Sequence, residues 1–106
     1  MRWQPAAMPW VNPLVSTAPD WDAAQARRLA RQLGFVVVPP SEVSLVPLVD
    51  QARAADVDAV IVPSPDHVDA YMLHALMCIV DVETVCPRMS FARWSELPRW
   101  GRGRLG

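Results

Sequence analysis

The chain has 106 residues, 52% of them hydrophobic and 20% charged, a composition that indicates one globular domain and excludes an intrinsically disordered protein. No apolar run approaches the ~20 residues that a membrane-spanning helix needs. The formal net charge is −1, but it is unevenly distributed: residues 1–87 carry −5 and residues 88–106 carry +4.

The first ten residues contain tryptophan and proline and no continuous apolar stretch, so we expect no signal peptide and a cytoplasmic protein. Cys78 and Cys86 fall in predicted core elements and are expected to be buried and reduced. Their spacing matches no metal motif, so no metal site and no cofactor is expected. All ten basic residues are arginine, a bias typical of GC-rich genomes such as those of actinobacteria.

In chain order, residues 1–10 are interpreted as an N-terminal Pro/Trp arm, because their prolines disfavour a helix. Residues 11–17 are the first strand candidate, with Pro13 suited to a strand start. Residues 20–33 are the clearest helix, with an apolar stripe at i, i+3, i+4 and i+7. Asp20 is a candidate N-cap, and Gly34 stands where a glycine ends a helix.

The second half of the pattern continues this alternation. Residues 35–38 predict a buried strand, and residues 45–54 predict a short helix with Ser44 as its cap and Pro47 in its first turn. Residues 58–62 predict a central strand, because residues 59–62 are a short apolar run rich in β-branched side chains. Ser64 and Pro65 then suit the start of a helix over 65–79. A fourth strand is expected over 82–86, followed by a basic Arg/Trp tail over 88–106.

Strands that alternate with helices favour a parallel sheet with right-handed crossovers and helices on both faces. We therefore expect an α/β fold over residues 11–87. Its architecture would be a three-layer α/β/α sandwich around a mostly parallel sheet of four strands, in the flavodoxin-like order 2-1-3-4.

Three pieces of sequence, in this order of elements, resemble the N-terminal catalytic domain of serine recombinases, the resolvase/invertase family. They are Val15-Ser16-Thr17 after a strand, residues 29–35 across a helix end and the next strand, and residues 58–68 across a strand and turn. The resemblance covers about residues 11–87. It implies a resolvase-like fold and places Ser16 where the family has its DNA-attacking nucleophile.

The resemblance does not extend to the family's phosphate-binding arginines. Their positions hold Leu14, His67 and Ala70, and residues 39–47 contain no arginine. A serine without cationic partners is a poor nucleophile toward a phosphodiester. The sequence therefore favours a catalytically inactive resolvase-like domain that acts as a small protein-interaction or regulatory module. Its expected partner is another protein or a second copy, through an apolar helix face or a sheet edge. Tyr71, Met72 and Met77, on the helix after the third strand, are the candidates for a self-contact.

Two alternatives come from other residues. If the first and third strands are neighbours, five side chains should gather at the switch point of the sheet and form a small-anion site: Ser16, Thr17, Ser64, Asp66 and His67. The corresponding enzyme hypothesis is that Ser16 acts as a nucleophile and His67 is the base that takes its proton. The tail offers a nucleic-acid hypothesis, through Arg93, Arg99, Trp100, Arg102 and Arg104.

Overall fold

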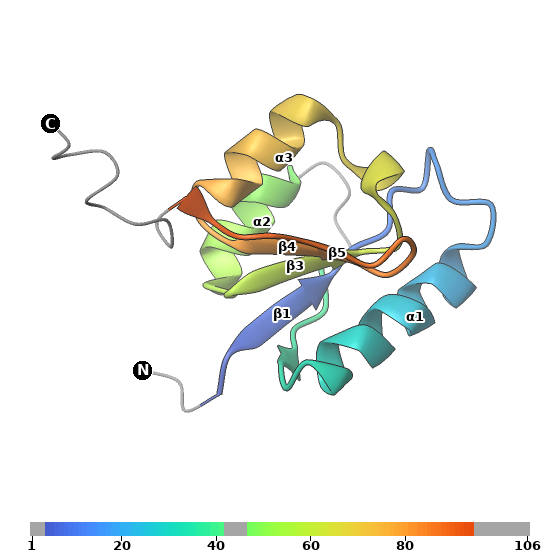
Figure 1. Ribbon diagram of the computed structural model, residues 1–106, viewed down its shortest axis with the longest axis horizontal. Helices are drawn as coiled ribbons and strands as arrows, with labels where there is room; N and C mark the ends of the chain where they lie inside the picture. The colour runs from blue at the N-terminus through green and yellow to red at the C-terminus, as the bar shows by residue number, and fades with distance from the viewer. Residues whose placement is uncertain (1–3, 42–46, 95–106) are drawn as a thin grey trace, which may run out of the picture.

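The computed structural model describes residues 4–41 and 47–94. Within them, strands and helices alternate along the chain before a final strand pair (Figure 1). The elements are β1 Ala6–Pro9, α1 Pro19–Gln32, β2 Val36–Val37, α2 Leu48–Ala55, β3 Ala59–Val62, a 3-10 turn η1 Pro65–His67, α3 Ala70–Met77, β4 Asp81–Thr84 and β5 Met89–Phe91.

The strands form one sheet in the order β2-β1-β3-β4-β5. The first four are parallel, with Ala7 of β1 opposite both Val37 of β2 and Ala59 of β3. Strand β5 is antiparallel to β4. The α/β class is as predicted. The sheet differs from the predicted four-strand order 2-1-3-4 by its fifth strand and by the residues that form its first strand.

The first strand is Ala6–Pro9, so the interpretation of residues 1–10 as an arm and of residues 11–17 as a strand is wrong. The four residues of β1 are buried, and three of them have little or no exposed surface. Pro9 is tolerated because it ends the strand, and the N–H of Trp10 then bonds to the Ile61 carbonyl at 2.8 Å. Residues 11–17 form a loop instead, in which the Leu14 side chain is 94% exposed.

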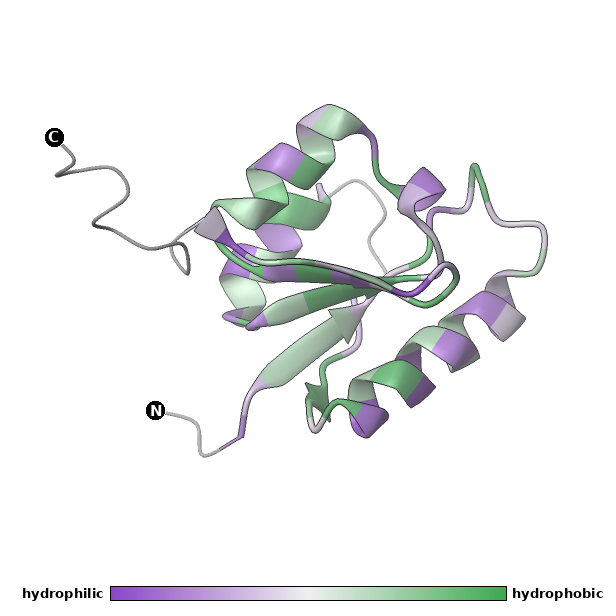
Figure 2. Ribbon diagram, viewed as in Figure 1, coloured by the Kyte–Doolittle hydropathy of each residue, from purple (hydrophilic) through white to green (hydrophobic). Residues whose placement is uncertain are grey.

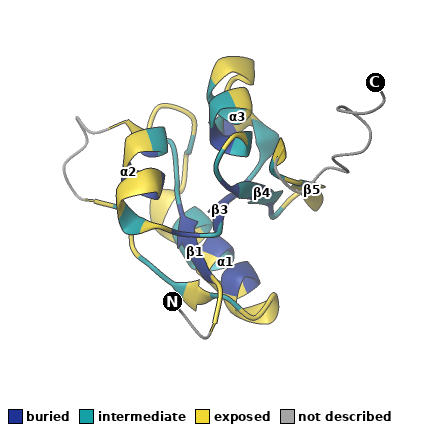
Figure 3. Cartoon of the chain, turned by 90° about the vertical axis from the view of Figure 1, so that its left-hand side faces the viewer, coloured by how far each residue is buried: buried dark blue, intermediate teal, exposed yellow. Residues whose placement is uncertain are grey.

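Helices cover both faces of the sheet, which gives the three layers that the alternation predicts (Figure 1). Helix α1 packs on one face, where Ala26, Leu29 and Ala30 meet Ala7 and Ile61. Helices α2 and α3 cover the other face, around a core that includes Met8, Val60, Val62, Leu48 and Leu76. Strands β1 and β3 are apolar along their length and buried on both faces, as central parallel strands are (Figures 2 and 3).

Helix α1 confirms the clearest helix prediction, although its start differs. Pro19 is its first residue and Ala18 its N-cap, so Asp20 lies inside the first turn. Gly34 ends the helix as predicted, with a φ of 85°. Its N–H bonds to the Arg31 carbonyl and the N–H of Phe35 to the Ala30 carbonyl, a Schellman motif in which glycine takes the left-handed position.

The helix predicted over residues 65–79 is divided in two. The turn η1 ends at His67, Val68 is extended, and α3 begins at Ala70. The α3 cap is Asp69, whose Oδ1 accepts the Met72 N–H at 2.7 Å. Ser64 precedes η1 but makes no capping hydrogen bond through its side chain. His67 therefore belongs to a separate turn and not to α3.

Three smaller predictions are also corrected. Strand β2 is an edge strand of two residues, and Val36 is exposed instead of buried. Pro47 is the N-cap of α2 and not part of its first turn, while Ser44 lies outside the described residues. Residues 88–94 are not a tail, because β5 pairs with β4 and Arg88 forms an ion pair with Glu83 at 2.8 Å.

Candidate binding site at the carboxyl end of the sheet

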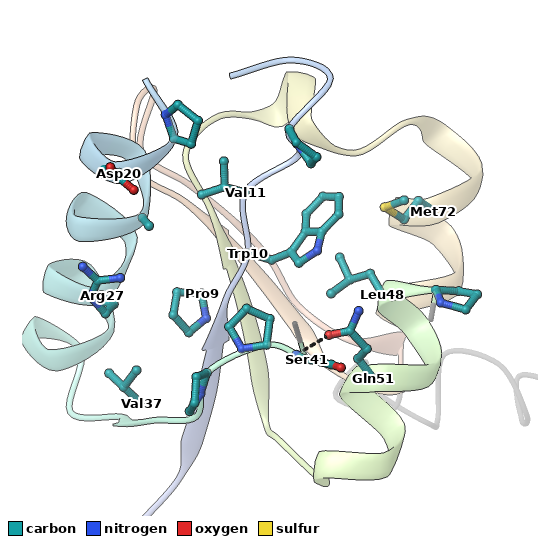
Figure 4. Close-up of a pocket in the computed structure, with 16 residues that line it drawn as sticks. Pro9, Trp10, Val11, Asp20, Arg27, Val37, Ser41, Leu48, Gln51 and Met72 are labelled. Carbon is teal, nitrogen blue, oxygen red and sulfur yellow. Dashed lines mark hydrogen bonds between the residues drawn. The ribbon is translucent and has the colours of Figure 1, made fainter. Parts of the chain in front are cut away.

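A cavity of about 560 Å³ opens beyond the carboxyl ends of β1 and β2 (Figure 4). One wall comes from α1, the opposite wall from α2 with Met72 of α3, and the floor from the residues that follow the two strands. The lining residues are Pro9, Trp10, Val11, Pro13, Pro19, Asp20, Ala23, Arg27, Val37, Pro39, Pro40, Ser41, Pro47, Leu48, Gln51 and Met72.

The topology explains this position. The chain leaves β1 toward α1 on one face, and it leaves β2 toward α2 on the other face. Loops that depart to opposite faces leave a crevice at the carboxyl ends of the strands, which is where α/β sheets bind ligands. The cavity lies at such a point, and its size is within the range of about 300–1,000 Å³ that ligand sites occupy.

The lining is mainly apolar and rigid. Trp10 lies between the helices, and its side chain faces Leu48 and Met72 (Figure 4). Six of the sixteen lining residues are prolines, whose rings fix the backbone and offer no N–H. Such a wall changes little when a ligand enters, so an apolar ligand loses little of its binding energy to reorganisation of the site.

Polar groups lie at two places on this cavity. Asp20 and Arg27 come from α1, seven residues apart and therefore on roughly the same face. On the opposite side the Gln51 side chain is 7% exposed, and its Oε1 accepts the N–H of Ser41 at 2.8 Å. The cavity therefore combines an apolar centre with one acidic, one basic and one amide group.

His67 lies beside this region and is buried, with 3% of its surface exposed. Its Nδ1 accepts the backbone N–H of Asn12 at 2.9 Å, and its carbonyl accepts the Asn12 side-chain amide at 3.2 Å. Burial lowers the pKa of His67, and the negative charges of Asp22 and Asp66 partly offset that effect. The neutral imidazole thus fastens the β1–α1 loop onto η1.

Ser16 lies in the same loop but is engaged elsewhere. Its Oγ donates to Oδ2 of Asp22 at 2.6 Å and accepts the N–H of Ala18 at 3.1 Å. In neutral His67 the Nδ1 is an acceptor for Asn12, so the proton is on Nε2, which cannot then act as a base. The geometry gives no support to proton transfer from Ser16 to His67.

The other residues predicted to form the anion site do not act together. Thr17 and Asp66 are exposed, and Ser64 is half-buried without a capping bond. The carboxylates of Asp22 and Asp66 act electrostatically on His67, so their charge would oppose a phosphate at this position. The small-anion hypothesis stays a prediction that these contacts do not favour.

Of the nucleic-acid candidates, only Arg93 lies within the described residues. Its backbone N–H donates to Oδ1 of Asp81 at 2.8 Å, and its Nε lies 3.8 Å from the same oxygen. An arginine held by a carboxylate is less available to a phosphate. Arg99, Trp100, Arg102 and Arg104 lie outside the described residues.

Cys78 and Cys86 are both exposed free thiols, so the prediction that they are buried is wrong. Among residues 4–41 and 47–94, no three His, Cys, Asp or Glu side chains are grouped so that they could hold a metal ion. In the same part of the chain, none of the helices has the length and apolar character that a membrane span requires.

The sequence did not reveal the cavity or the role of Asn12. The cavity depends on prolines that are far apart in the chain, each of which reads locally as a turn or a helix boundary. Asn12 precedes Pro13, a pair typical of turns, but its bonds to His67 join residues 55 positions apart. Trp10 was a weak signal, since a tryptophan beside a strand is commonly explained by packing.

Comparison with protein-family models, curated proteins and solved structures finds no match to this chain.

Proposed function

We propose that this chain is a non-catalytic interaction module that binds an apolar side chain of a partner protein in the cavity between α1 and α2. The observation that carries the proposal is the cavity itself, about 560 Å³ in volume and lined by Trp10 and six prolines. Interfaces gain most of their binding energy where one bulky apolar residue enters a rigid, desolvated pocket.

The charged groups favour a peptide segment as the ligand. Asp20 and Arg27 are seven residues apart on α1, and at 1.5 Å per residue their Cα atoms are separated by roughly 10 Å along the helix axis. One compact ion cannot bridge that distance. About three residues of extended chain span it, with a basic group toward Asp20 and an acidic group toward Arg27.

The inference that a resolvase-like domain is catalytically inactive here comes from the sequence. The positions that would need arginine hold Leu14, His67 and Ala70, of which His67 is buried and neutral. Moreover, Ser16 does not follow β1 directly, because the strand ends at Pro9 and the hydroxyl bonds to Asp22. These observations support binding over DNA cleavage.

The test is an amide NMR titration of the full chain with N-acetyl-tryptophan amide and N-acetyl-leucine amide, and with N-acetyl-aspartate amide for comparison. The two apolar probes should shift the Trp10 indole N–H and the Gln51 side-chain amide, which line the cavity. The aspartate probe should not. Shifts that avoid the cavity, or no shift at millimolar probe, would overturn the proposal.

A filled cavity provides the matched control. Ala23→Phe places a ring in the cavity from α1 and should reduce probe affinity at least tenfold. Arg28→Phe adds the same ring to an exposed position of the same helix and should leave the titration unchanged. Where Ala23→Phe perturbs the spectrum of the free protein, the smaller Ala23→Leu gives the same comparison.

A further inference from the structure

Three exposed apolar side chains lie where the β1–α1 loop leads into α1. Leu14 is 94% exposed, Trp21 is 64% exposed and Val15 is 41% exposed. We call these three residues the Trp21 patch. Several large apolar side chains exposed in one short part of the chain favour an interaction surface, because such residues gain by burial.

Hydrogen bonds fix the backbone that presents this patch. Leu14 donates its N–H to the Asn12 side-chain oxygen at 2.9 Å, and Asn12 is bonded to buried His67. On the other side of the patch, Ser16 is bonded to Asp22, the residue after Trp21. The patch is therefore held between η1 and the first turn of α1, and it adjoins the cavity through Pro13 and Asp20.

The surroundings of the patch are acidic. Residues 10–22 and 63–70, which form the loops at this end of the sheet, contain four aspartates and no arginine or lysine. Asp20 and Asp22 flank Trp21 in the sequence. Asp22 bonds to Ser16 of the β1–α1 loop, and Asp66 precedes His67, which accepts the Asn12 N–H of the same loop. A partner segment that combines apolar residues with positive charge complements this surface.

The chain contains such a segment. Residues 95–106 hold three arginines and one glutamate, interleaved with Leu97, Trp100 and Leu105. Its net charge of +2 is opposite in sign to the aspartates near the Trp21 patch. Its bulky side chains are apolar, as those of the patch are.

The described part of the chain ends, at Trp94, on the opposite side of the molecule from the Trp21 patch (Figure 1). Arg93 bonds to Asp81, the first residue of β4, and therefore lies at the amino end of the parallel strands. The Trp21 patch lies beyond their carboxyl ends, and Figure 1 shows these two ends on opposite sides of the molecule. A second copy can present residues 95–106 to the patch without crossing its own sheet.

We propose that residues 95–106 of one copy bind the Trp21 patch and the neighbouring Asp20 and Asp22 on the next copy, so that the chain associates with itself head to tail. The proposal goes beyond the proposed function, because it concerns the surface beside the cavity and names a second copy of the chain as the partner. An interface between two different surfaces leaves both free at the ends of an assembly. The assembly therefore grows with concentration instead of stopping at a dimer.

The first test is the mass of the full chain by light scattering over a range of concentrations and at two salt concentrations. The wild type should exceed the 11.8 kDa of one chain at high concentration, and less so in high salt, because the ionic contacts are screened. Trp21→Ala should return the mass to one chain, as should Arg99→Gln with Arg102→Gln and Arg104→Gln. Tyr71→Ala, a change at another exposed aromatic residue, should not.

Mixing the two variants is the decisive experiment. The Trp21→Ala chain keeps its segment but lacks the patch, and the triple arginine variant keeps the patch but lacks the segment. Each alone should be a monomer, and the mixture should form a one-to-one pair and nothing larger. A wild type that stays monomeric at every concentration, or variants that still associate by themselves, would overturn the proposal.

Two further readouts separate this result from its alternatives. The apolar probes bind the cavity in both variants if the proposed function holds, whether or not the chain self-associates. If the cavity binds no probe but association depends on Trp21 and the arginines, the self-association proposal survives and the cavity proposal fails. Binding of duplex DNA by a monomeric wild type, lost in the triple arginine variant, would assign the segment to nucleic acid and reject self-association.

Discussion

At the scale of single residues, the fold gives His67 a structural role that its neighbours in sequence do not suggest. An imidazole in the first turn of a helix is normally exposed, but this one is buried and accepts a backbone hydrogen bond from a residue 55 positions away. The acceptor is available only while the ring is neutral, because protonated histidine is a donor at both nitrogens. The loop that carries the Trp21 patch is thus tied to the protonation state of His67.

This tie predicts how stability depends on pH. Burial sets the pKa of folded His67 below 6.5, so the unfolded chain takes up the proton first as the pH falls. The stability that comes from neutral His67 is complete above about pH 6.5 and is lost as the pH falls below that value toward the folded-state pKa. His67→Asn keeps an oxygen acceptor near the position of Nδ1 but does not titrate, so its stability should change less between about pH 7.5 and 5.5.

Urea unfolding at several pH values measures this difference. His74→Asn is the control, because His74 is exposed and lies on α3 away from the loop. It should keep the pH dependence of the wild type. Equal slopes for the wild type and His67→Asn would show that His67 titrates as it does in the unfolded chain.

At the scale of elements, the break between η1 and α3 determines what the central turn presents. Periodicity favours one helix from Pro65 to Ile79, since the apolar residues keep their spacing through the break. The structure ends η1 at His67 and restarts at Ala70, with Asp69 as the cap. Pro65 and Asp69 are both start signals, and the second one begins the longer helix.

Removing the side chain of Asp69 and removing that of Ser64 should affect stability differently. Asp69→Ala removes the acceptor of the Met72 N–H and should lower the free energy of unfolding by about 1 kcal/mol. Ser64→Ala removes no capping bond and should change it by less than about 0.5 kcal/mol. Chemical denaturation of both variants decides between them. A larger loss at Ser64 than at Asp69 would restore Ser64 as the cap of a continuous helix.

At the scale of the whole molecule, stability is concentrated in the centre of the sheet. Strand β3 has parallel neighbours on both sides and helices on both faces, and Ile61 has no exposed surface. Strand β2 is a two-residue edge where Val36 is 44% exposed. The short edge strand contributes little side-chain burial, whereas each residue of β3 contacts both the sheet and a helix layer.

The loss in the free energy of unfolding should therefore be several times larger when a side chain is truncated in β3 than when one is truncated in β2. Ile61→Ala should cost about 2–5 kcal/mol, a large part of the stability of a domain of this size. Val36→Ala should cost less than about 1 kcal/mol, because its side chain is already partly in water. Thermal and urea denaturation give both values. Similar losses at the two sites would mean that β2 is better packed than its exposure indicates.

The sequence alone determined the features that depend on neighbouring residues. Apolar spacing predicted α1, glycine at position 34 predicted its end, and the apolar run of residues 59–62, rich in β-branched side chains, predicted the central strand. Their alternation was enough for the α/β class, because a strand followed by a helix can bury its faces in few ways. These predictions succeed because local conformational preference and burial agree at each position.

The first strand, the break before α3 and the candidate site depend on contacts between segments far apart in the chain. Residues 6–9 are too few and too rich in alanine and proline to read as a strand, and they become one because β2 and β3 bond to them from both sides. The cavity and the Asn12–His67 contact likewise join residues far apart in the chain. Such long-range contacts have no local pattern, because their energy comes from partners that meet only when the sheet forms.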